Sequence, residues 1–512
     1  MLLLNLPPEL LHRIVQDSIP EGFENLILSC RTLYNVGSPF IERYSARKKQ
    51  YYKASIPGTD IKVSLYWLDQ IALEPALSWY MNEVDLRGRE AHSDRGSYIY
   101  EHSREIENLR NNEPTMQRVK ALIERSLYMT PGGVDPRFWA EQILSDIGDP
   151  DQYTEHNLFL GIFLLTLLPN VTKLTLPWHS SGLVPFSDAA RSIDQCKRVL
   201  NTIQQESRSG RDRRALSNLR RLIYDRKMEY NNRERLDFIS PLLILPKLES
   251  LLATSQVAVD YHMDFKWQYP GIESNLQTIE LVHSCMDAVS VSELLAHTPR
   301  LISFKYSHAS KHHGLGAYWD AGEFVAAIER HRGKQLRHLA ITIESHSLNG
   351  IDAGVTSMHG FTQLETLEMD FMFFCGPSIE SGEKVGILNM PPKPGYPEWT
   401  VEAIPHIQDI LPTCLQSFHL FFDVENCLSL DSAALIPFYS GFRSAHSSTF
   451  PNLVYCVVQI RGSRHDYISP SNLAGSSESQ DLDTTRKHLE AEGVECRSRS
   501  ELLPPWRLFL KW

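Results

Sequence analysis

One spacing of apolar residues recurs along most of this chain: an apolar residue, two others, an apolar residue, one other, and a final apolar residue. Repetition on this scale restricts the fold more than a single motif does, because each copy must be one structural unit. The last two apolar positions are two residues apart, like the buried positions of a β-strand. The spacing occurs at Val171-Leu174-Leu176, Leu248-Leu251-Ala253, Leu276-Ile279-Leu281, Leu301-Phe304-Tyr306, Leu336-Leu339-Ile341, Leu364-Leu367-Met369, Leu415-Phe418-Leu420 and Leu453-Cys456-Val458, and more weakly at Met81-Val84-Leu86.

Helical segments precede several of these expected strands. Ser290 with Glu293, and Asp320 with Glu323, have the spacing of a capping box at a helix start, and Gly333 is placed to end the second of these helices. Because a helix separates each strand from the next, we expect parallel strands and an α/β structure. The other expected helices are Glu155 to Leu168, Thr400 to Leu411 and Asp431 to Phe442.

The repeat resembles the leucine-rich-repeat family, although from Leu248 onward its units start between 25 and 51 residues apart, and they lack the Asn that usually follows the strand. The resemblance implies an irregular solenoid over residues 53–512, in which neighbouring units stack to bury their strand faces. Two segments interrupt the repeat, and we expect them to be helical insertions at about 92–150 and 187–235. The alternative is an ordinary α/β domain with a parallel sheet.

The N-terminal residues 1–52 follow a helical spacing instead. Pro7 and Pro8 suit the first turn of a helix, where a missing N–H has no partner to lose. We expect three short helices, separated at Pro20 to Gly22 and again at Gly37 to Pro39. A module of this size buries too little surface to be stable alone, so it is expected to pack on another surface. The first helix carries one apolar stripe, made of Leu10, Leu11, Ile14 and Val15.

The segments LPPELLHRIV and ENLILSCRTLYN resemble the F-box, in the form found in proteins of filamentous fungi. The likeness covers about a tenth of the chain, and the segment from Ser18 to Phe23 lacks the usual Leu-x-x-x-Asp-Leu junction. The matching residues are Leu6, Pro7, Glu9, Leu10, Ile14, Leu26, Cys30, Arg31 and Leu33.

This resemblance implies binding to the Skp-type adaptor of a cullin-RING ubiquitin ligase, and through the adaptor to a cullin. In the family, apolar residues of the first two helices insert between helices of the adaptor. Carried over position by position, the adaptor-binding residues are Leu6, Pro7, Leu10, Ile14, Leu26 and Cys30. The alternative is that these residues form the core of a helical cap on the next domain.

Composition excludes several classes of protein. The chain has 51 Lys and Arg against 62 Asp and Glu, and the resulting net charge of -11 argues against a nucleic-acid-coating protein. The longest apolar run, Leu158 to Leu168, is too short for a membrane span, which needs about 20 residues. Pro7 and Pro8 interrupt the opening apolar stretch, so we do not expect a signal peptide. Eight scattered cysteines without a CxxC pair predict buried thiols in a cytoplasmic or nuclear protein.

Other motifs give weaker signals. The Arg-rich part of residues 187–235 includes the sequence RDRR, but interspersed carboxylates favour a solvated helical face over a nuclear-import or nucleic-acid site. His308, His312 and His313 have no carboxylate or Cys at ligand spacing, so no metal site is expected. Gly314 to Gly316 is too short for a dinucleotide-binding loop, and no catalytic motif is present, so we expect neither a cofactor nor an enzyme.

The sequence thus predicts the substrate-recognition subunit of a cullin-RING ubiquitin ligase, with the repeats binding a protein substrate that the sequence does not identify. The rival hypothesis is a non-catalytic interaction scaffold whose F-box does not engage a ligase. Co-purification separates the two, because only the ligase subunit should bring the adaptor and a cullin with it.

Overall fold

A computed structural model gives the fold, and its chain divides into two compact units. The first unit comprises Met1–Asp225 and Pro241–Leu251, and the second comprises Arg226–Ser240 and Leu252–Trp512. The structure describes residues 3–56, 61–87, 112–130, 133–145, 157–176, 187–209, 214–224, 228, 230, 234–259, 263–311, 318–343, 350–374, 404–423, 434–461 and 477–499.

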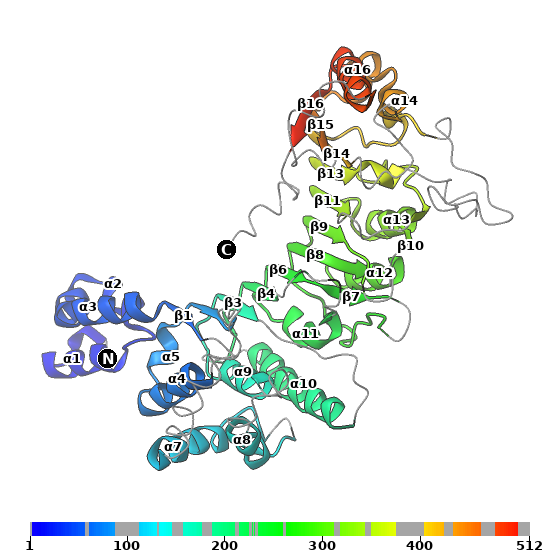
Figure 1. Cartoon of the computed structure of the whole chain (residues 1–512). Coiled ribbons are helices and arrows are strands. Elements are labelled where there is room, and N and C mark those ends of the chain that lie inside the picture. Colours follow the sequence, from blue (N-terminus) through cyan, green and yellow to red (C-terminus); the bar gives the residue numbers. More distant parts are fainter. Residues whose placement is uncertain are drawn as a thin grey trace. The chain divides into compact units, whose positions relative to one another are not determined.

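The first unit joins a group of N-terminal helices to four short strands. Its helices are η1 (Leu3–Asn5), α1 (Pro8–Asp17), α2 (Phe23–Leu28), α3 (Arg31–Tyr51), α4 (Ile61–Leu73), α5 (Leu77–Tyr80), α7 (Glu113–Glu124), α8 (Pro136–Ser145), α9 (Asn157–Leu165) and α10 (Ser187–Arg208). Its strands are β1 (Lys53–Ser55), β2 (Glu83–Asp85), β3 (Lys173–Leu176) and β4 (Arg221–Tyr224). Figure 1 shows α1, α2 and α3 grouped together at the N-terminal end of this unit.

The four strands of the first unit pair in parallel, in the order in which they occur along the chain. Val84, Leu174 and Leu222 are partners in register and are buried, which places the core on that side of the strands. Helix α9 is also buried, and its residues Phe163 and Leu164 are inaccessible to solvent. The opposite side of the strands is exposed or half-buried at Lys173 and Arg221, where β3 and β4 begin, and is buried further along at Thr175 and Ile223.

The second unit carries the longer series of strands. They are β5 (Glu234–Arg235), β7 (Gln256–Ala258), β8 (Thr278–Met286), β9 (Ser303–His308), β10 (Tyr318–Asp320), β11 (His338–Ile343), β12 (Gly350–Ala353), β13 (Thr366–Asp370), β14 (Ser417–Asp423), β15 (Tyr455–Arg461) and β16 (Glu495–Arg499). Its helices are α12 (Ala288–Ala296), α13 (Ala321–Arg332), η4 (Phe371–Phe374), η7 (Ile407–Asp409), α14 (Leu435–Tyr439), α15 (Phe442–Thr449) and α16 (Ser477–Ala491). Two elements, α11 (Leu236–Leu243) and β6 (Ser250–Thr254), contain residues of both units.

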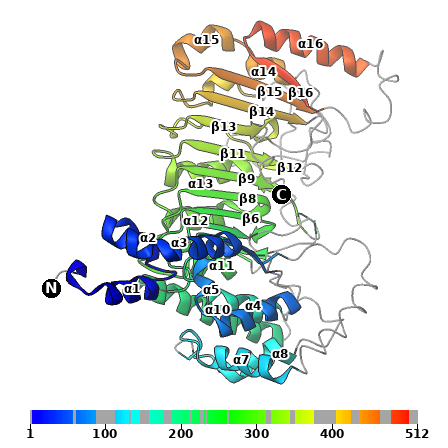
Figure 2. The same cartoon turned by 90° about the vertical axis from the view of Figure 1, so that its left-hand side faces the viewer.

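Strand follows strand in chain order from β8 to β16 in the second unit, as Figure 2 shows, whereas β10 and β12 form a separate pair. The repeated apolar positions coincide in register. Ile279, Phe304, Leu339, Leu367, Phe418 and Cys456 form one buried line across six strands, and the final apolar position of each repeat forms a second. Burying each such side chain contributes roughly 1.5–3 kcal/mol, so neighbouring strands stabilise one another.

The predicted α/β class is confirmed, because fourteen of the described strands belong to the parallel main sheet. Every one of the nine apolar repeats coincides with a described strand, including the weaker one at Val84. Seven described strands were not predicted, namely β1, β4, β5, β7, β10, β12 and β16. Among them, β4 lies inside residues 187–235, which the sequence predicted to be a helical insertion. Leu219, Leu222 and Tyr224 have the repeat spacing, but the neighbouring arginines resemble a solvated helical face.

Some helix predictions need correction. Helix α12 begins at Ala288 instead of Ser290, because the Asp287 side chain accepts a hydrogen bond from the Ser290 N–H at 2.7 Å and caps the helix. Asp320 caps α13 as predicted, by accepting from the Glu323 N–H at 2.8 Å. Of the helix expected at Thr400 to Leu411, the described part contains only the short η7. The helix expected at Asp431 to Phe442 is divided by Gly441, whose φ of 76° is left-handed.

Gly333, which follows α13, gives a direct test of the packing in the second unit. A Cβ atom at this position would lie 2.6 Å from two backbone oxygens, those of Glu329 and Gly360. Backbone atoms cannot move aside cheaply, so Gly333→Ala should lower the free energy of unfolding by about 1–3 kcal/mol. Thermal denaturation measures the effect as a lower melting temperature.

The matched control is Gly22→Ala, because a Cβ atom there would first meet another atom at 3.9 Å, an ordinary contact. We expect this variant to melt within a degree or two of the wild type. Equal melting temperatures for Gly333→Ala and the wild type would contradict the close contact between Gly333 and the backbone of Gly360.

Candidate functional site

The three N-terminal helices enclose a small apolar core. Pro8 is the first residue of α1, and Pro7 precedes it with an extended ψ of 144°, so the two prolines fix where the helix begins. The core is shared by all three helices and by α5, which supplies a tyrosine. Its buried members are Leu11, Val15, Phe23, Ile27, Leu33, Tyr44 and Tyr80.

Helix α3 is longer than the sequence predicts. The expected break at Gly37 to Pro39 is wrong, because the helix continues through both residues and the break lies at Cys30. A Cβ atom at Gly37 would collide with Ile27 Cγ2 and would lie 3.5 Å from Val15 Cγ1. The glycine therefore lets α3 approach the other two helices closely. Pro39 is exposed, so the helix tolerates its missing N–H.

Charged contacts fasten α3 to its neighbours. Arg47 donates to both carboxylate oxygens of Glu74, with one N···O distance of 2.9 Å, and Lys48 pairs with Glu24 at 2.6 Å. Burial and the nearby Glu24 carboxylate raise the pKa of Tyr44 well above its usual value, so its hydroxyl stays protonated. The exposed ion pairs each contribute at most about 1 kcal/mol. They hold α3 in place without involving any predicted adaptor-binding residue.

The predicted adaptor-binding residues differ in exposure. Leu10 is 51% exposed and Pro7 is exposed, whereas Leu6, Ile14, Leu26 and Cys30 are half-buried. Leu6, Leu26 and Cys30 pack against the helical core from its margin. The next residue along α1, Leu11, is only 4% exposed, so one helix has an inward and an outward apolar stripe.

Further exposed apolar side chains of the same helices were not predicted as site residues. Leu3, Leu4, Leu28 and Tyr34 are all exposed, with Leu28 at 74%. Leu28 directly follows the buried Ile27, and a helical projection places it outside the core-facing arc. We refer to the six predicted residues together with these four as the N-terminal apolar surface.

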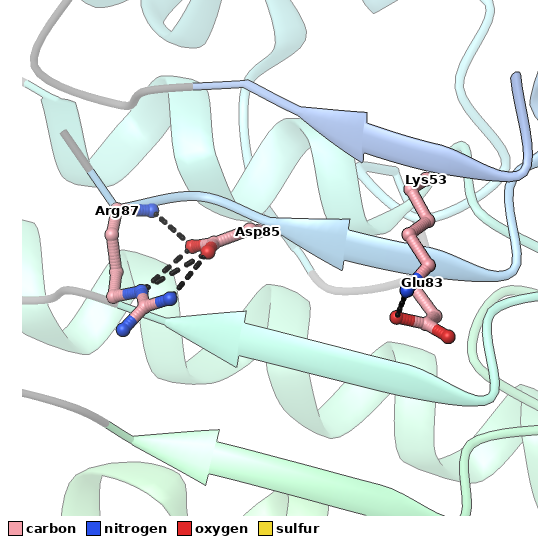
Figure 3. A network of polar contacts seen from close by, with 4 residues as sticks. All are labelled: Lys53, Glu83, Asp85 and Arg87. Carbon is pink, nitrogen blue, oxygen red and sulfur yellow. Dashed lines mark hydrogen bonds and ion pairs between the residues drawn. The ribbon is translucent and has the colours of Figure 1, made fainter. Parts of the chain in front are cut away.

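A row of charged residues crosses the outer side of the strands in the same unit (Figure 3). Lys53 on β1 pairs with Glu83 on β2 at 3.2 Å, and the two residues are partners in register. Further along β2, Asp85 accepts from the Arg87 guanidinium at 2.6 Å and from the Arg87 backbone N–H at 2.9 Å. The charged residues of β1 and β2 therefore form ion pairs with each other or with Arg87, which follows β2.

The remaining sequence candidates contribute no site among the described residues. His308 is fully buried, stacked on Trp319 with ring centroids 4.2 Å apart, and within 2.9 Å of the Tyr306 hydroxyl, so it is a core residue. Several of these candidates lie outside the described residues, namely His312, His313, the glycines at 314 and 316, and residues 211–213 of the RDRR sequence. Arg214 pairs with Glu206 at 3.0 Å, and both side chains are largely buried, so this pair does not lie on a solvated face.

The cysteines and the acidic side chains offer little reactive chemistry in the described part of the chain. Burial raises the pKa of both Cys285 and Cys456 to about 12, so these thiols stay protonated at neutral pH. No group of three or more His, Cys, Asp or Glu within the described ranges could hold a metal ion. Nor do those ranges contain a helix that is both long and apolar enough to cross a membrane.

Comparison with known proteins gives no family assignment. No protein-family model matches the chain, and no curated protein matches it significantly. The functional argument therefore depends on the residues themselves.

The close contact between Gly37 and Ile27 can be tested by a double-mutant cycle. Gly37→Ala should lower the free energy of unfolding by about 1–3 kcal/mol through overpacking, and Ile27→Ala by about 2–5 kcal/mol through a cavity. In the double variant the methyl group added at position 37 has room. The loss of unfolding free energy in the double variant should therefore be smaller than the sum of the losses in the two single variants. Chemical denaturation followed by circular dichroism measures all three variants. Strictly additive effects would contradict the described contact.

Proposed function

We propose that this protein is the substrate-recognition subunit of a cullin-RING ubiquitin ligase, which binds the Skp-type adaptor through an F-box formed by α1, α2 and α3. The observation that carries the proposal is the outer apolar stripe of α1, in which Leu10 is exposed and Ile14 is half-buried, beside the buried stripe of Leu11 and Val15. The resemblance of the N-terminal sequence to the F-box supports the identity of the partner.

The apolar surface of α1 is wider than its own core requires. Leu10 and Ile14 are four residues apart, so they lie on the same side of the helix, and the Leu11 and Val15 pair is rotated by about 100° from them. Only the second pair belongs to the buried core of the three helices, whereas Leu10 is exposed and Ile14 is half-buried. Exposed apolar residues grouped in this way are typical of protein interaction sites. A helix that presents anchors at i and i+4 suits insertion into an apolar groove of a helical partner.

The strand-bearing part of the chain would then form a leucine-rich-repeat-like solenoid that binds the protein substrate. In such a ligase the reactive cysteine belongs to the ubiquitin-conjugating enzyme. This chain would hold the substrate near that enzyme and so raise the effective concentration of a substrate lysine. The raised pKa values of the buried thiols agree with this division of roles, because a protonated thiol is a poor nucleophile.

A charge-insertion pair tests adaptor binding. The variant Leu10→Asp/Ile14→Asp places two carboxylates where an apolar groove is expected, so capture of a purified Skp-type adaptor should weaken about a hundredfold or more. Arg13→Asp/Gln16→Asp adds the same two side chains to exposed positions on the polar side of α1 and should bind like the wild type. Calorimetry measures the affinities, and circular dichroism checks that both variants fold.

Two results would contradict the proposal. If the wild-type chain fails to bind the adaptor or to co-purify with a cullin, the scaffold hypothesis replaces the ligase hypothesis. If Leu10→Asp/Ile14→Asp binds the adaptor with unchanged affinity, the assigned surface is wrong even though the partner is right.

A further inference from the structure

The charged row on the outer side of the first unit's strands continues beyond Lys53 and Glu83. Glu83 is the register partner of Lys173 on β3, and Lys173 is the register partner of Arg221 on β4. Side chains of register partners point to the same side of a sheet. Leu174 and Leu222, the next residues on β3 and β4, are fully buried, so Lys173 and Arg221 point away from the core.

The row begins with a positive residue, Lys53, and a negative one, Glu83, but it then continues with two positive residues, Lys173 and Arg221. Two like charges on neighbouring strands roughly 4.8 Å apart repel each other, and such pairs destabilise a sheet. Glu83 forms an ion pair with Lys53 at 3.2 Å, and Glu249 forms one with Arg220 at 2.6 Å. Within the part of the chain that the structure describes, neither Lys173 nor Arg221 forms an ion pair. Among the described residues, no carboxylate therefore lies between these two cations.

We infer that Lys173 and Arg221 bind an Asp- or Glu-rich segment of a partner protein. The inference rests on the proposed function, in which that partner is the ligase substrate. Carboxylates already fit the geometry, because Lys53 and Glu83 make an ion pair between β1 and β2, and Arg220 and Glu249, which directly precede β4 and β6, make another. One carboxylate of the partner would lie between Lys173 and Arg221. A second would neutralise the positive charge that remains on this pair.

The surroundings favour an acidic peptide over a nucleic acid. Glu83, Asp85 and Glu249 all lie near the two cations along the same strands and their edges, and they would repel a continuous chain of phosphates. The chain as a whole carries a net charge of -11, which opposes nucleic-acid binding further. A short acidic segment can place its charges on the two cations alone, and its attraction is local and sensitive to salt.

The test uses a fluorescein-labelled peptide of alternating Glu and Ser, with fluorescence anisotropy of the full chain as the readout. Lys173→Ala/Arg221→Ala should weaken binding about fivefold, because each exposed ion pair contributes up to about 1 kcal/mol. Lys120→Ala/Arg125→Ala removes the same charge from an exposed position of α7 and from the exposed residue that follows this helix, and it should bind like the wild type. Equal losses in the two double variants would show a general charge effect and overturn the inference.

A charge reversal separates binding from folding. Arg221→Glu supplies a carboxylate from within the chain, so the row alternates fully, and the melting temperature should stay equal or rise while peptide binding is lost. Retained peptide binding in this variant would overturn the inference.

Competition identifies the ligand class. A phosphoserine peptide of equal charge, or oligothymidine, should compete no better than the Glu peptide, and stronger competition by either would overturn the assignment to a carboxylate segment.

Adaptor affinity, measured on the same samples, keeps this inference distinct from the proposed function. The Lys173→Ala/Arg221→Ala variant should bind the adaptor normally, and Leu10→Asp/Ile14→Asp should bind the Glu peptide normally. If the adaptor never binds but the peptide result holds, only the ligase context fails. If the adaptor binds and the peptide does not distinguish the variants, only the inferred site fails.

Discussion

Register-matched burial between neighbouring parallel strands is the constraint on which the structure depends. A single strand with one apolar face cannot cover that face by itself, so each repeat requires the next. In the second unit the same position of six successive repeats, from Ile279 to Cys456, falls in one line across the sheet. This arrangement fixes which side chains point inward, and it thereby leaves the alternate positions of each strand available for polar contacts. The charged row of the first unit occupies such positions.

The N-terminal helices bury only part of their apolar surface within the chain. Their core is small and closes because Gly37 allows α3 to approach Ile27 and Val15. Closing it uses only one of the two apolar stripes of α1, and Leu10 remains half exposed. An apolar stripe that folding does not bury is costly for an isolated protein, and a partner that covers it recovers that free energy. The proposed adaptor contact gives this stripe a function, and the strands provide a separate surface for a substrate.

The sequence predicted the features that have a period. Nine repeats gave nine strands and the parallel α/β class, because alternation of buried and exposed positions is a direct consequence of strand geometry. It failed where a residue serves tertiary packing. Gly37 looked like a helix end but is a contact point, and Asp287 took the capping role expected of Ser290. Strand β4 was not predicted because Arg220 and Arg221 suggested a solvated helix. That Leu28 is exposed while its neighbour Ile27 is buried follows only from the orientation of α2 against the core. The placement of Lys173 beside Arg221 depends on register between distant segments, which no local pattern contains.

Protection of the Cys30 thiol tests the central claim, that the N-terminal apolar surface is covered by the adaptor. Cys30 is half-buried at the start of α3, whereas Cys285 and Cys456 are buried, with pKa values of about 12, and serve as internal controls. Alkylation by iodoacetamide, followed by mass spectrometry of the native chain, reports the labelling rate of each cysteine with and without saturating adaptor. The account predicts that the adaptor slows labelling of Cys30 severalfold and leaves the two controls unchanged. An unchanged labelling rate of Cys30 in the adaptor complex would contradict it.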